Sequence, residues 1–233
     1  MNQEKNPEPY QRHVRSFILR QSRLTKGQSK AIDEHWSTYG LEIEDGMLDY
    51  TQVFQREAPV IVEIGFGDGQ SLLTQAQQNP QQDYIGIEVH APGVGRLIME
   101  AEKAKTRNIR IYRFDAVEVL QKCIPDNSLA GLQLFFPDPW PKKRHFKRRI
   151  VQPDFVQMVR QKLKVEGFFH MATDWEHYAQ QMMEVLSDAP GFSNTSGEGQ
   201  YAPRPESRPI TKFETRGQNL GHGVWDLIFE KMP

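Results

Sequence analysis

From Val60 onward, short apolar runs alternate with longer segments of helical character, and no other pattern in the sequence restricts the fold as strongly. The helical segments end near Asn79, Arg107, Cys123, Lys164 and Ser187, and the apolar runs that precede them read VIVEI, DYIGIEV, IRIYRF, LAGLQLFF and GFFHMAT. Strands and helices that alternate in this way form a parallel sheet covered by helices on both faces. The sequence therefore predicts an α/β fold.

The last two predicted helices carry apolar side chains at helical spacing. One stripe consists of Phe155, Val156, Val159 and Leu163, and the other of Trp175, Tyr178, Met182, Val185 and Leu186. We interpret both stripes as contacts with the core. Beyond Pro190 the sequence is rich in Gly, Pro and Ser, which predicts a long loop before a final strand, VWDLIFEKM.

A chain of 233 residues with 38% hydrophobic residues can bury one substantial core. We expect a basic, flexible arm over residues 1–35, where the sequence is largely polar, and a single domain over residues 36–233. No apolar run reaches the length that spans a bilayer, and the N-terminal stretch lacks the apolar core of a signal peptide. These features predict a soluble, cytoplasmic protein with no membrane partner.

The chain contains a single cysteine, Cys123, which excludes an internal disulfide. Because no His-rich spacing surrounds this thiol, it cannot form a zinc cluster, and we expect no metal. We interpret Cys123 as a small helix residue. A catalytic thiol is the alternative, but no base is recognisable near it in the sequence.

The charge is distributed unevenly along the chain. A net charge of -1 argues against nucleic acid as a partner, yet residues 142–149 hold six Lys or Arg, one His and no acid. Residues 1–30 hold seven Lys or Arg against two Glu. The sequence therefore contains two segments that can hold a polyanion.

A glycine-rich turn, VEIGFGDG, follows the first predicted strand. It places Glu63 at the end of the strand and Gly65, Gly67 and Gly69 in the turn, where glycine allows a positive φ and a close approach to a ligand. Alone, this pattern is also typical of a tight turn that binds nothing. Glu88 ends the second strand about twenty residues later, where an acid can accept hydrogen bonds from a ribose.

This spacing suits a nicotinamide cofactor as well as S-adenosylmethionine. Three features favour S-adenosylmethionine: Glu63 suits a cationic amino group better than a pyrophosphate, Asp115 ends the third strand within reach of an adenine, and the third glycine follows the second by two residues rather than three. Each acid alone is equally typical of a helix N-cap. A phosphate-loop NTPase is disfavoured because no Gly-Lys-Ser/Thr follows.

Asp138 follows the fourth strand, between Pro137 and Pro139, at the edge of the sheet where open α/β folds bind ligands. Trp140 offers a flat face for a base or a pocket wall, although a Pro-rich turn with a buried Trp anchor is the alternative. The basic run KKRHFKRR begins a few residues later. Such a run is also typical of a solvated face or a nuclear localisation segment, but its place beside Asp138 favours binding of phosphates.

The segments VEIGFGDG, IGIEVHAPGVG, FFPDPWPKKRHFKRR, ATDWEHY and TKFETRG together resemble the bacterial tRNA (guanine-N7-)-methyltransferase family. The resemblance covers about Val60 to Lys231, and FPDPWPKKRHFKRR is its most specific part. It implies a Rossmann-like class I methyltransferase fold with a seven-stranded, mostly parallel sheet, an antiparallel last strand and helices on both faces. The implied reaction transfers a methyl group from S-adenosylmethionine to N7 of a variable-loop guanosine in tRNA, at position 46 of the tRNA, leaving S-adenosylhomocysteine.

The expected site residues follow from these motifs. The cofactor contacts are Glu63, Gly65, Gly67, Gly69, Glu88, Asp115 and Asp138, of which Asp138 is also the catalytic residue. The resemblance implies substrate contacts at Lys142, Asp174, Thr211, Lys212, Phe213 and Glu214, and RNA contacts at Arg144, His145, Phe146, Lys147, Arg148 and Arg149. Asp174 equally suits a cap of the helix that follows. His170 and His177 are interpreted as structural.

Guanine N7 carries an in-plane lone pair and no proton at neutral pH, so its methylation requires no general base. Asp138 is therefore expected to position the guanine or to complement the charge that moves onto it. Two other functions remain open from the residues alone: a methyltransferase that acts on a small molecule or protein, and a catalytically silent RNA-binding module. The sequence does not distinguish a monomer from a homodimer, and no protein partner is required.

Overall fold

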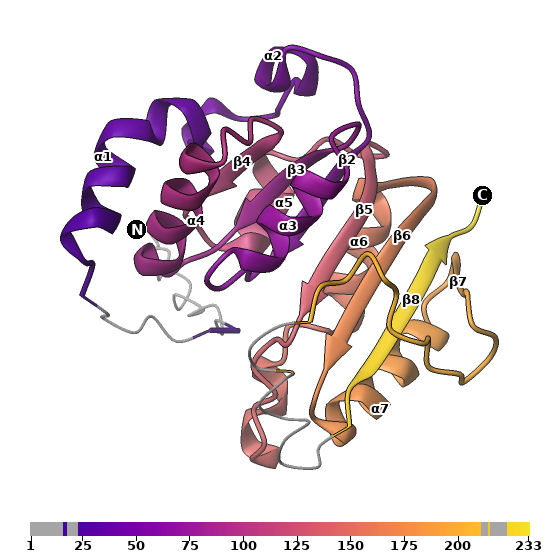
Figure 1. Cartoon of the computed structure of the whole chain (residues 1–233). Coiled ribbons are helices and arrows are strands. Elements are labelled where there is room, and N and C mark those ends of the chain that lie inside the picture. The colour runs from indigo at the N-terminus through magenta and orange to yellow at the C-terminus, as the bar shows by residue number, and fades with distance from the viewer. Residues whose placement is uncertain (1–15, 18–22, 211–213, 215–222) are drawn as a thin grey trace, which may run out of the picture.

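The computed structural model describes residues 16–17, 23–210, 214 and 223–233 (Figure 1). The α-helices are α1 (Lys26–Tyr39), α2 (Tyr50–Phe54), α3 (Gln70–Gln78), α4 (Ala91–Lys103), α5 (Ala116–Lys122), α6 (Pro153–Lys162) and α7 (Glu176–Ser187). Two short 3-10 helices are η1 (Ile43–Asp45) and η2 (Lys143–Arg148). The strands are β1 (Gly40–Leu41), β2 (Val60–Ile64), β3 (Asp83–Ile87), β4 (Ile109–Tyr112), β5 (Leu129–Phe135), β6 (Leu163–Thr173), β7 (Phe192–Asn194) and β8 (Trp225–Lys231).

The strands form one sheet in the order β1-β4-β3-β2-β5-β6-β8-β7. Neighbouring strands from β1 through β6 are parallel, whereas β8 is antiparallel to both β6 and β7. The predicted α/β class and antiparallel last strand are therefore confirmed. The described sheet has eight strands rather than seven, because the two-residue β1 adds to the β4 edge.

Strand β7 lies where the residue pattern predicts only loop. It has three residues, Phe192–Asn194, which are too few to show an alternation of apolar and polar side chains. Its pairing with β8, rather than its own composition, makes it a strand.

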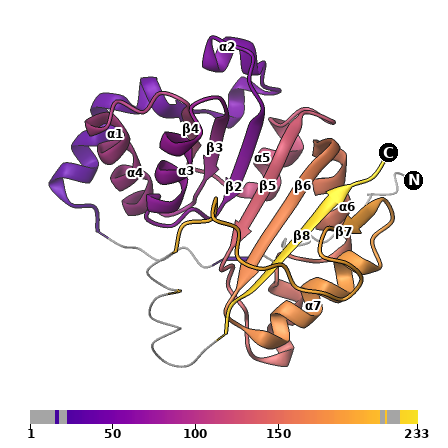
Figure 2. The same ribbon diagram turned by 45° about the vertical axis from the view of Figure 1, so that its right-hand side comes forward.

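Two apolar clusters cover the two faces of the sheet. One packs beneath α1, α3 and α4, and the other beneath α2, α5, α6 and α7, as Figures 1 and 2 show. Strand β2 serves both, because Val62 belongs to the second cluster and its neighbour Ile61 to the first. None of the helices among the described residues is long and apolar enough to cross a membrane.

The predicted helical stripes are largely buried. Phe155, Val156, Val159 and Leu163 are buried on α6 and at the start of β6, and Tyr178, Met182 and Leu186 are buried on α7. Trp175 was predicted to contact the core, but it is 39% exposed. The reason is that Trp175 is the N-cap of α7 and lies outside the helix that carries the stripe.

The folded domain begins before the boundary at residue 36 that the sequence predicts. Residues 26–35 belong to α1, which begins with a capping box between Thr25 and Gln28. Gln28 packs against Gly95 of α4 and donates a 3.1 Å hydrogen bond to the carbonyl of Pro92. Residues 26–35 are thus part of the folded domain, and residues 1–15 and 18–22 lie outside the described residues.

Candidate functional site

The carboxyl ends of the parallel strands gather the predicted acids at one edge of the sheet. Glu63 lies near the end of β2, Glu88 directly after β3, and Asp138 and Asp174 shortly after β5 and β6. The chain continues from β2 to β3 on one side and returns to β5 on the other side. This change of direction is the place where open α/β sheets bind ligands.

The glycine turn has the backbone that the sequence predicts. Gly65, Gly67 and Gly69 have φ angles of 71°, 58° and 75°, in the region that favours glycine. A Cβ atom at Gly65 or Gly67 would meet nothing within 4 Å, whereas one at Gly69 would collide with Leu97. Gly65 and Gly67 therefore border open space in which a ligand can approach the backbone.

Glu88 holds the glycine turn in shape. Its Oε2 accepts a 2.9 Å hydrogen bond from the amide of Gly67, and its Oε1 accepts bonds of 2.7 and 2.9 Å from the amides of Val89 and His90. A carboxylate offers about four acceptor positions, so three of them serve the protein itself. Glu88 organises the site, and about one acceptor position is left for a ligand hydroxyl.

Helix α4 presses directly on the same turn. A Cβ atom added at Gly93 would lie 1.9 Å from the carbonyl oxygen of Gly67. No side chain fits into this distance, so the first turn of α4 can approach the loop only because residue 93 is glycine.

Glu63 is a buried acid with an unsatisfied oxygen. The side chain is 3% exposed, and Oε2 has no hydrogen-bond partner among the described residues. Burial raises the pKa of Glu63 to about 8, and the nearby charge of Glu88 adds to the increase. Its register partner on β5, Gln133, also has an unpaired buried oxygen, Oε1. Two unpaired oxygens in a buried position suit a cationic ligand group.

The other two strand-end acids differ in their local roles. Asp115 is the N-cap of α5 and accepts a 2.9 Å bond from the amide of Val117, as the capping alternative predicts. Asp174 does not cap α7, because the N-cap is Trp175, whose amide donates to Thr173 Oγ1 at 3.2 Å. The half-buried carboxylate of Asp174 is thus available to a ligand at the edge of the sheet.

The turn that carries Asp138 has a strained backbone. Phe136 and Trp140 lie on either side of this residue with φ angles of 50° and 43°, a region that costs a non-glycine residue about 1–3 kcal/mol. Two hydrogen bonds hold it: the Phe136 amide donates to Ala172 O at 2.8 Å, and the Trp140 indole donates to Ser16 O at 2.9 Å. Trp140 therefore acts as an anchor, and Asp138 lies exposed between the two fixed residues.

The basic run forms η2, directly after this turn. Lys142, Lys143, Arg144 and Lys147 expose their side chains. Partial burial and the charges of Arg144 and its basic neighbours lower the pKa of His145, which disfavours the charged form of this side chain. The exposed lysines and arginine provide the positive surface that the sequence predicts.

Three members of the run face inward. Arg148 lies 3.7 Å above the ring of Trp140, and Phe146 packs 4.9 Å from the ring of His177. Arg149 was predicted to bind RNA, but it is 1% exposed and stacks on Phe146 and Tyr178. Arg149 therefore offers no exposed surface to RNA in this structure, because charge density alone does not indicate which residues of a basic run point inward.

Arg149 instead joins the Asp138 turn to α7. Its Nε donates to the carbonyl of Pro139 at 2.8 Å, and its Nη1 donates to Gln181 Oε1 at 2.5 Å and lies 3.1 Å from His177 Nδ1. The guanidinium therefore supports the backbone beside Asp138.

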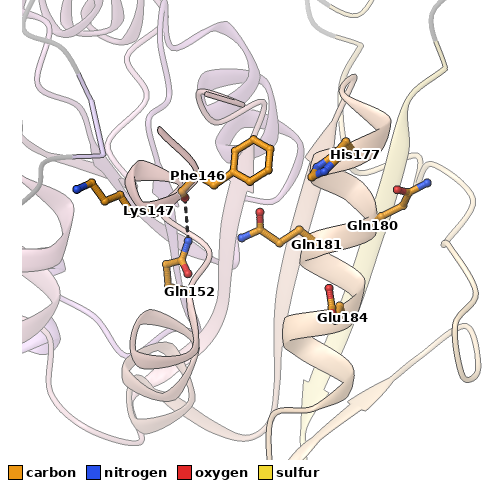
Figure 3. Close-up of a pocket in the computed structure, with 7 residues that line it drawn as sticks. All are labelled: Phe146, Lys147, Gln152, His177, Gln180, Gln181 and Glu184. Carbon is orange, nitrogen blue, oxygen red and sulfur yellow. Dashed lines mark hydrogen bonds between the residues drawn. The ribbon is translucent and has the colours of Figure 1, made fainter. Parts of the chain in front are cut away.

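A pocket of about 390 Å³ lies between η2 and α7 (Figure 3). Its lining residues are Phe146, Lys147, Gln152, His177, Gln180, Gln181 and Glu184. None of the predicted cofactor residues lines it. This pocket is therefore separate from the glycine turn, where the unpaired oxygens and the open backbone lie.

The remaining predicted residues have mixed outcomes. Glu214 is 1% exposed and pairs with Arg208 through bonds of 2.7 and 3.0 Å. Residues 211–213, predicted to bind substrate, lie outside the described residues. Cys123 is buried, and burial raises the pKa of its thiol, which disfavours the catalytic alternative. No group of three or more His, Cys, Asp or Glu suited to a metal occurs among the described residues.

Sequence reasoning missed three residues that shape this edge: Gly93, Gln133 and Arg208. A polar Gln inside the apolar run LAGLQLFF and a glycine in the first turn of a helix are both unusual and were available as signals. Arg208 gives no such signal, because it lies in a Gly- and Pro-rich segment where a charged residue is ordinary.

Solved structures with a similar fold are methyltransferases. The 16S rRNA methyltransferase KamB superposes with a TM-score of 0.59 at 15% identity, covering 80% of this chain and 95% of that chain. A 16S rRNA (adenine(1408)-N(1))-methyltransferase from Catenulisporales acidiphilia superposes with a TM-score of 0.54 at 13% identity, covering 83% and 92%. At such identities the similarity concerns the fold alone, which is the Rossmann-like fold predicted from the sequence.

Sequence comparison is more specific. A family model described as "Putative methyltransferase" matches residues 57–227. The tRNA (guanine-N(7)-)-methyltransferase of Pseudoalteromonas atlantica is 58% identical, covering 96% of this chain and 93% of the relative. That of Yersinia enterocolitica is 59% identical, covering 94% and 92%, and that of Alcanivorax borkumensis is 58% identical, covering 99% and 98%. The chain therefore belongs to the tRNA (guanine-N(7)-)-methyltransferase family.

Proposed function

We propose that this protein transfers a methyl group from S-adenosylmethionine to N7 of a guanine in tRNA, and that the target is the variable-loop guanosine at position 46 of the tRNA. The supporting observation is one arrangement of three parts. Asp138 lies at the carboxyl edge of the sheet, with the buried Glu63 and the glycine turn on the β2 side and the basic η2 directly after it. Relatives 58–59% identical over nearly the whole chain carry the name of this activity.

The residues at the glycine turn fit S-adenosylmethionine. The unpaired Oε2 of Glu63 suits the cationic amino group, and the open space before Gly65 and Gly67 admits a ligand to the backbone. Glu88 and Asp115, at the ends of neighbouring strands, suit the ribose and the adenine. When bound, S-adenosylmethionine supplies an electrophilic methyl group on a sulfonium.

Asp138 positions the guanine rather than removing a proton. Because N7 carries a free lone pair, the protein needs only to align the base and complement the positive charge that develops on it. The Asp138 carboxylate can accept hydrogen bonds from guanine N1 and N2 or lie beside the purine, and its negative charge serves in either position. The strained residues on both sides of it hold the carboxylate in place before the base arrives.

The exposed cations of η2 hold the RNA backbone. Lys142 lies four residues after Asp138, and Arg144 and Lys147 follow on the exposed side. Phosphate contacts fix the orientation of a nucleic acid but carry no sequence information. The shape of the folded tRNA therefore supplies the selectivity for one guanine.

The decisive experiment incubates the protein with labelled S-adenosylmethionine and bulk tRNA, then cleaves the RNA chemically at 7-methylguanosine and maps the break. We expect one cleavage site, in the variable loop. Label that enters a protein or metabolite extract and leaves tRNA unlabelled contradicts the proposal. Absence of S-adenosylmethionine binding in calorimetry indicates a silent RNA-binding module instead.

Replacing Asp138 tests the catalytic role. We expect Asp138→Asn to lower kcat for tRNA methylation by about 100-fold or more, since a preorganised charge is removed where charge develops. The melting temperature should change little, because the side chain is not buried. Asp188→Asn, an exposed acid at the far end of α7, is the matched control and should retain the parent rate. An Asp138→Asn enzyme with parent kcat rules out the assigned role.

A further inference from the structure

A buried arginine joins the segment after β7 to the sheet. This segment pairs with the edge of β8 through Ala202 and Asp226 and then crosses the face of β8 and β6 (Figure 2). Arg208 is 1% exposed, and its guanidinium contacts two buried carboxylates. It donates to Glu214 at 2.7 and 3.0 Å and to Asp226 at 2.7 and 2.9 Å.

The network continues into the central strands. Asp226 Oδ1 on β8 lies 2.7 Å from Nε2 of His170 on β6, and the ring of His170 meets the ring of Phe135 edge-on at 4.9 Å. Burial works against the charged form of Asp226, but the hydrogen bonds from His170 and Arg208 outweigh it and lower the pKa. The aspartate therefore stays ionised between its two partners.

The same arginine reaches the turn that carries Asp138. Its guanidinium carbon lies 5.9 Å from the ring centroid of Phe135 and 5.7 Å from that of Phe136. Phe136 is one of the strained residues next to Asp138, and its amide is bonded to β6. Arg208 thus contacts Glu214 directly, and it also contacts Phe136, which precedes Asp138 in the same turn.

Such a cluster is an expensive way to gain stability. The free-energy cost of removing charged groups from water offsets much of the stabilisation that comes from their attraction. Apolar side chains of similar volume often stabilise a fold equally well. What the cluster provides is geometry. The planar guanidinium binds two carboxylates at once in fixed directions, which the single ammonium of lysine cannot reproduce.

We propose that Arg208 is a positioning residue for methyl transfer. It fixes Glu214 at the carboxyl edge of the sheet and supports the Phe136 end of the Asp138 turn, without touching the reacting atoms itself. This inference rests on the proposed function, since Asp138 is the group that receives the guanine.

The conservative variant Arg208→Lys tests this role because it keeps the positive charge and removes the planar guanidinium that binds two carboxylates at once. We expect kcat at saturating S-adenosylmethionine and tRNA to fall by about 10- to 100-fold, since displacement of a positioned group by about an ångström has effects of this size. The Kd for S-adenosylmethionine, measured by calorimetry, should stay within about threefold, because Glu63 and the glycine turn make no contact with Arg208 among the described residues.

Arg56→Lys is the matched control. Arg56 also pairs with a buried carboxylate, Asp83, through bonds of 2.6 and 3.0 Å, but it does so at the amino end of β3, away from the site. We expect this variant to lower the melting temperature by less than Arg208→Lys does, because the Arg56 side chain is 39% exposed, and to leave kcat unchanged. If Arg208 had only a structural role, Arg208→Lys would likewise lower the melting temperature and leave kcat unchanged.

A second variant covers the case in which Arg208→Lys does not fold. Glu214→Gln keeps the shape of the side chain, weakens the same pair, and should lower kcat with an unchanged Kd for S-adenosylmethionine. Parent-like kcat in either folded variant overturns the positioning role. If instead the parent protein transfers no methyl group to tRNA while binding S-adenosylmethionine, the proposed function fails first, and the inference falls with it.

Discussion

Glu63 is a buried acid at the position where we propose that the cationic group of the cofactor binds. Its carboxyl group is buried at the end of β2 with an unpaired oxygen, so the folded protein without ligand favours the protonated form. A cationic ligand group requires the ionised form. We therefore expect a cationic group that binds at Glu63 to displace a proton.

The first consequence is a pH-dependent stability. The pKa of Glu63 is about 8 in the folded protein and near 4.5 in the unfolded chain, so the folded state binds more protons between these values. The free energy of unfolding should therefore fall as the pH rises from about 4.5 to 8, by on the order of 3–5 kcal/mol in total, relative to Glu63→Gln. Urea unfolding of both proteins across this range measures the difference.

The control for this prediction is ligand binding. Near pH 7 the parent protein should release a proton when it binds S-adenosylmethionine, which calorimetry in buffers of different ionisation enthalpy detects. Glu63→Gln should bind more weakly and release no such proton. Equal pH dependence of the two unfolding curves contradicts a raised pKa at this position.

At the scale of elements, the site depends on how closely α4 approaches the glycine turn. Two glycines on different elements make the contact: Gly67 presents its carbonyl, and Gly93 has no side chain to meet it. Glu88 adds a second link, because it accepts from Gly67 and from the amides that lead into α4. The turn and the start of α4 are thus joined by a close backbone contact and by the hydrogen bonds of Glu88.

A methyl group at position 93 should push the start of α4 away from the glycine turn. We expect Gly93→Ala to weaken S-adenosylmethionine binding by at least tenfold and to destabilise the protein by about 1–3 kcal/mol, because the new Cβ overlaps the Gly67 carbonyl. Calorimetric titration and thermal unfolding measure the two effects.

Gly27→Ala provides the comparison. Gly27 lies in α1, where a new Cβ would meet only the Met99 sulfur at 3.8 Å, an ordinary contact. This variant should bind S-adenosylmethionine normally and gain up to about 1 kcal/mol of stability. If Gly93→Ala binds as well as Gly27→Ala, the contact between α4 and the turn does not control the site.

At the scale of the whole molecule, a protein of net charge -1 carries a local positive surface beside its site. The structure divides the basic run into exposed cations such as Arg144 and Lys147 and the buried Arg149, which joins the Asp138 turn to α7. Residues that are adjacent in sequence therefore contribute to different properties.

Neutralising the two kinds of residue should have separable effects. The double variant Arg144→Ala, Lys147→Ala should bind tRNA more weakly, and the slope of log K against log salt should become shallower by about 0.7–0.9 for each phosphate that the protein no longer neutralises. Arg149→Met should instead lower the free energy of unfolding by about 2–3 kcal/mol, because it removes buried hydrogen bonds of a charged group. Filter binding at several salt concentrations and urea unfolding measure these effects.

The folded fraction of Arg149→Met serves as the internal check. Its salt slope should match that of the parent protein, since the Arg149 guanidinium is 1% exposed and cannot meet a phosphate in this structure. A shallower slope in Arg149→Met would mean that this side chain leaves its buried position when RNA binds.

Much of the architecture follows from local pattern. Alternating apolar runs and helical segments predicted the parallel strands from β2 to β6 and the helices between them. The reason is that buried apolar side chains recur along the sequence with the spacing of the strand or helix to which they belong. The same pattern placed Glu63, Glu88, Asp138 and Asp174 at the ends of strands. Positive φ at Gly65, Gly67 and Gly69 also followed from residue type.

Other features depend on contacts between residues distant in sequence, and local pattern cannot encode these. The sequence specified the order of strand and helix, the strand-end acids and the basic run, because these depend on residues a few positions apart. Only the tertiary structure decided that Arg149 is buried, that Gly93 meets Gly67, and that Arg208 links Glu214 to Asp226. The physical reason is that burial and hydrogen bonding of a charged group depend on which distant side chains the packed sheet brings within about 3 Å of it.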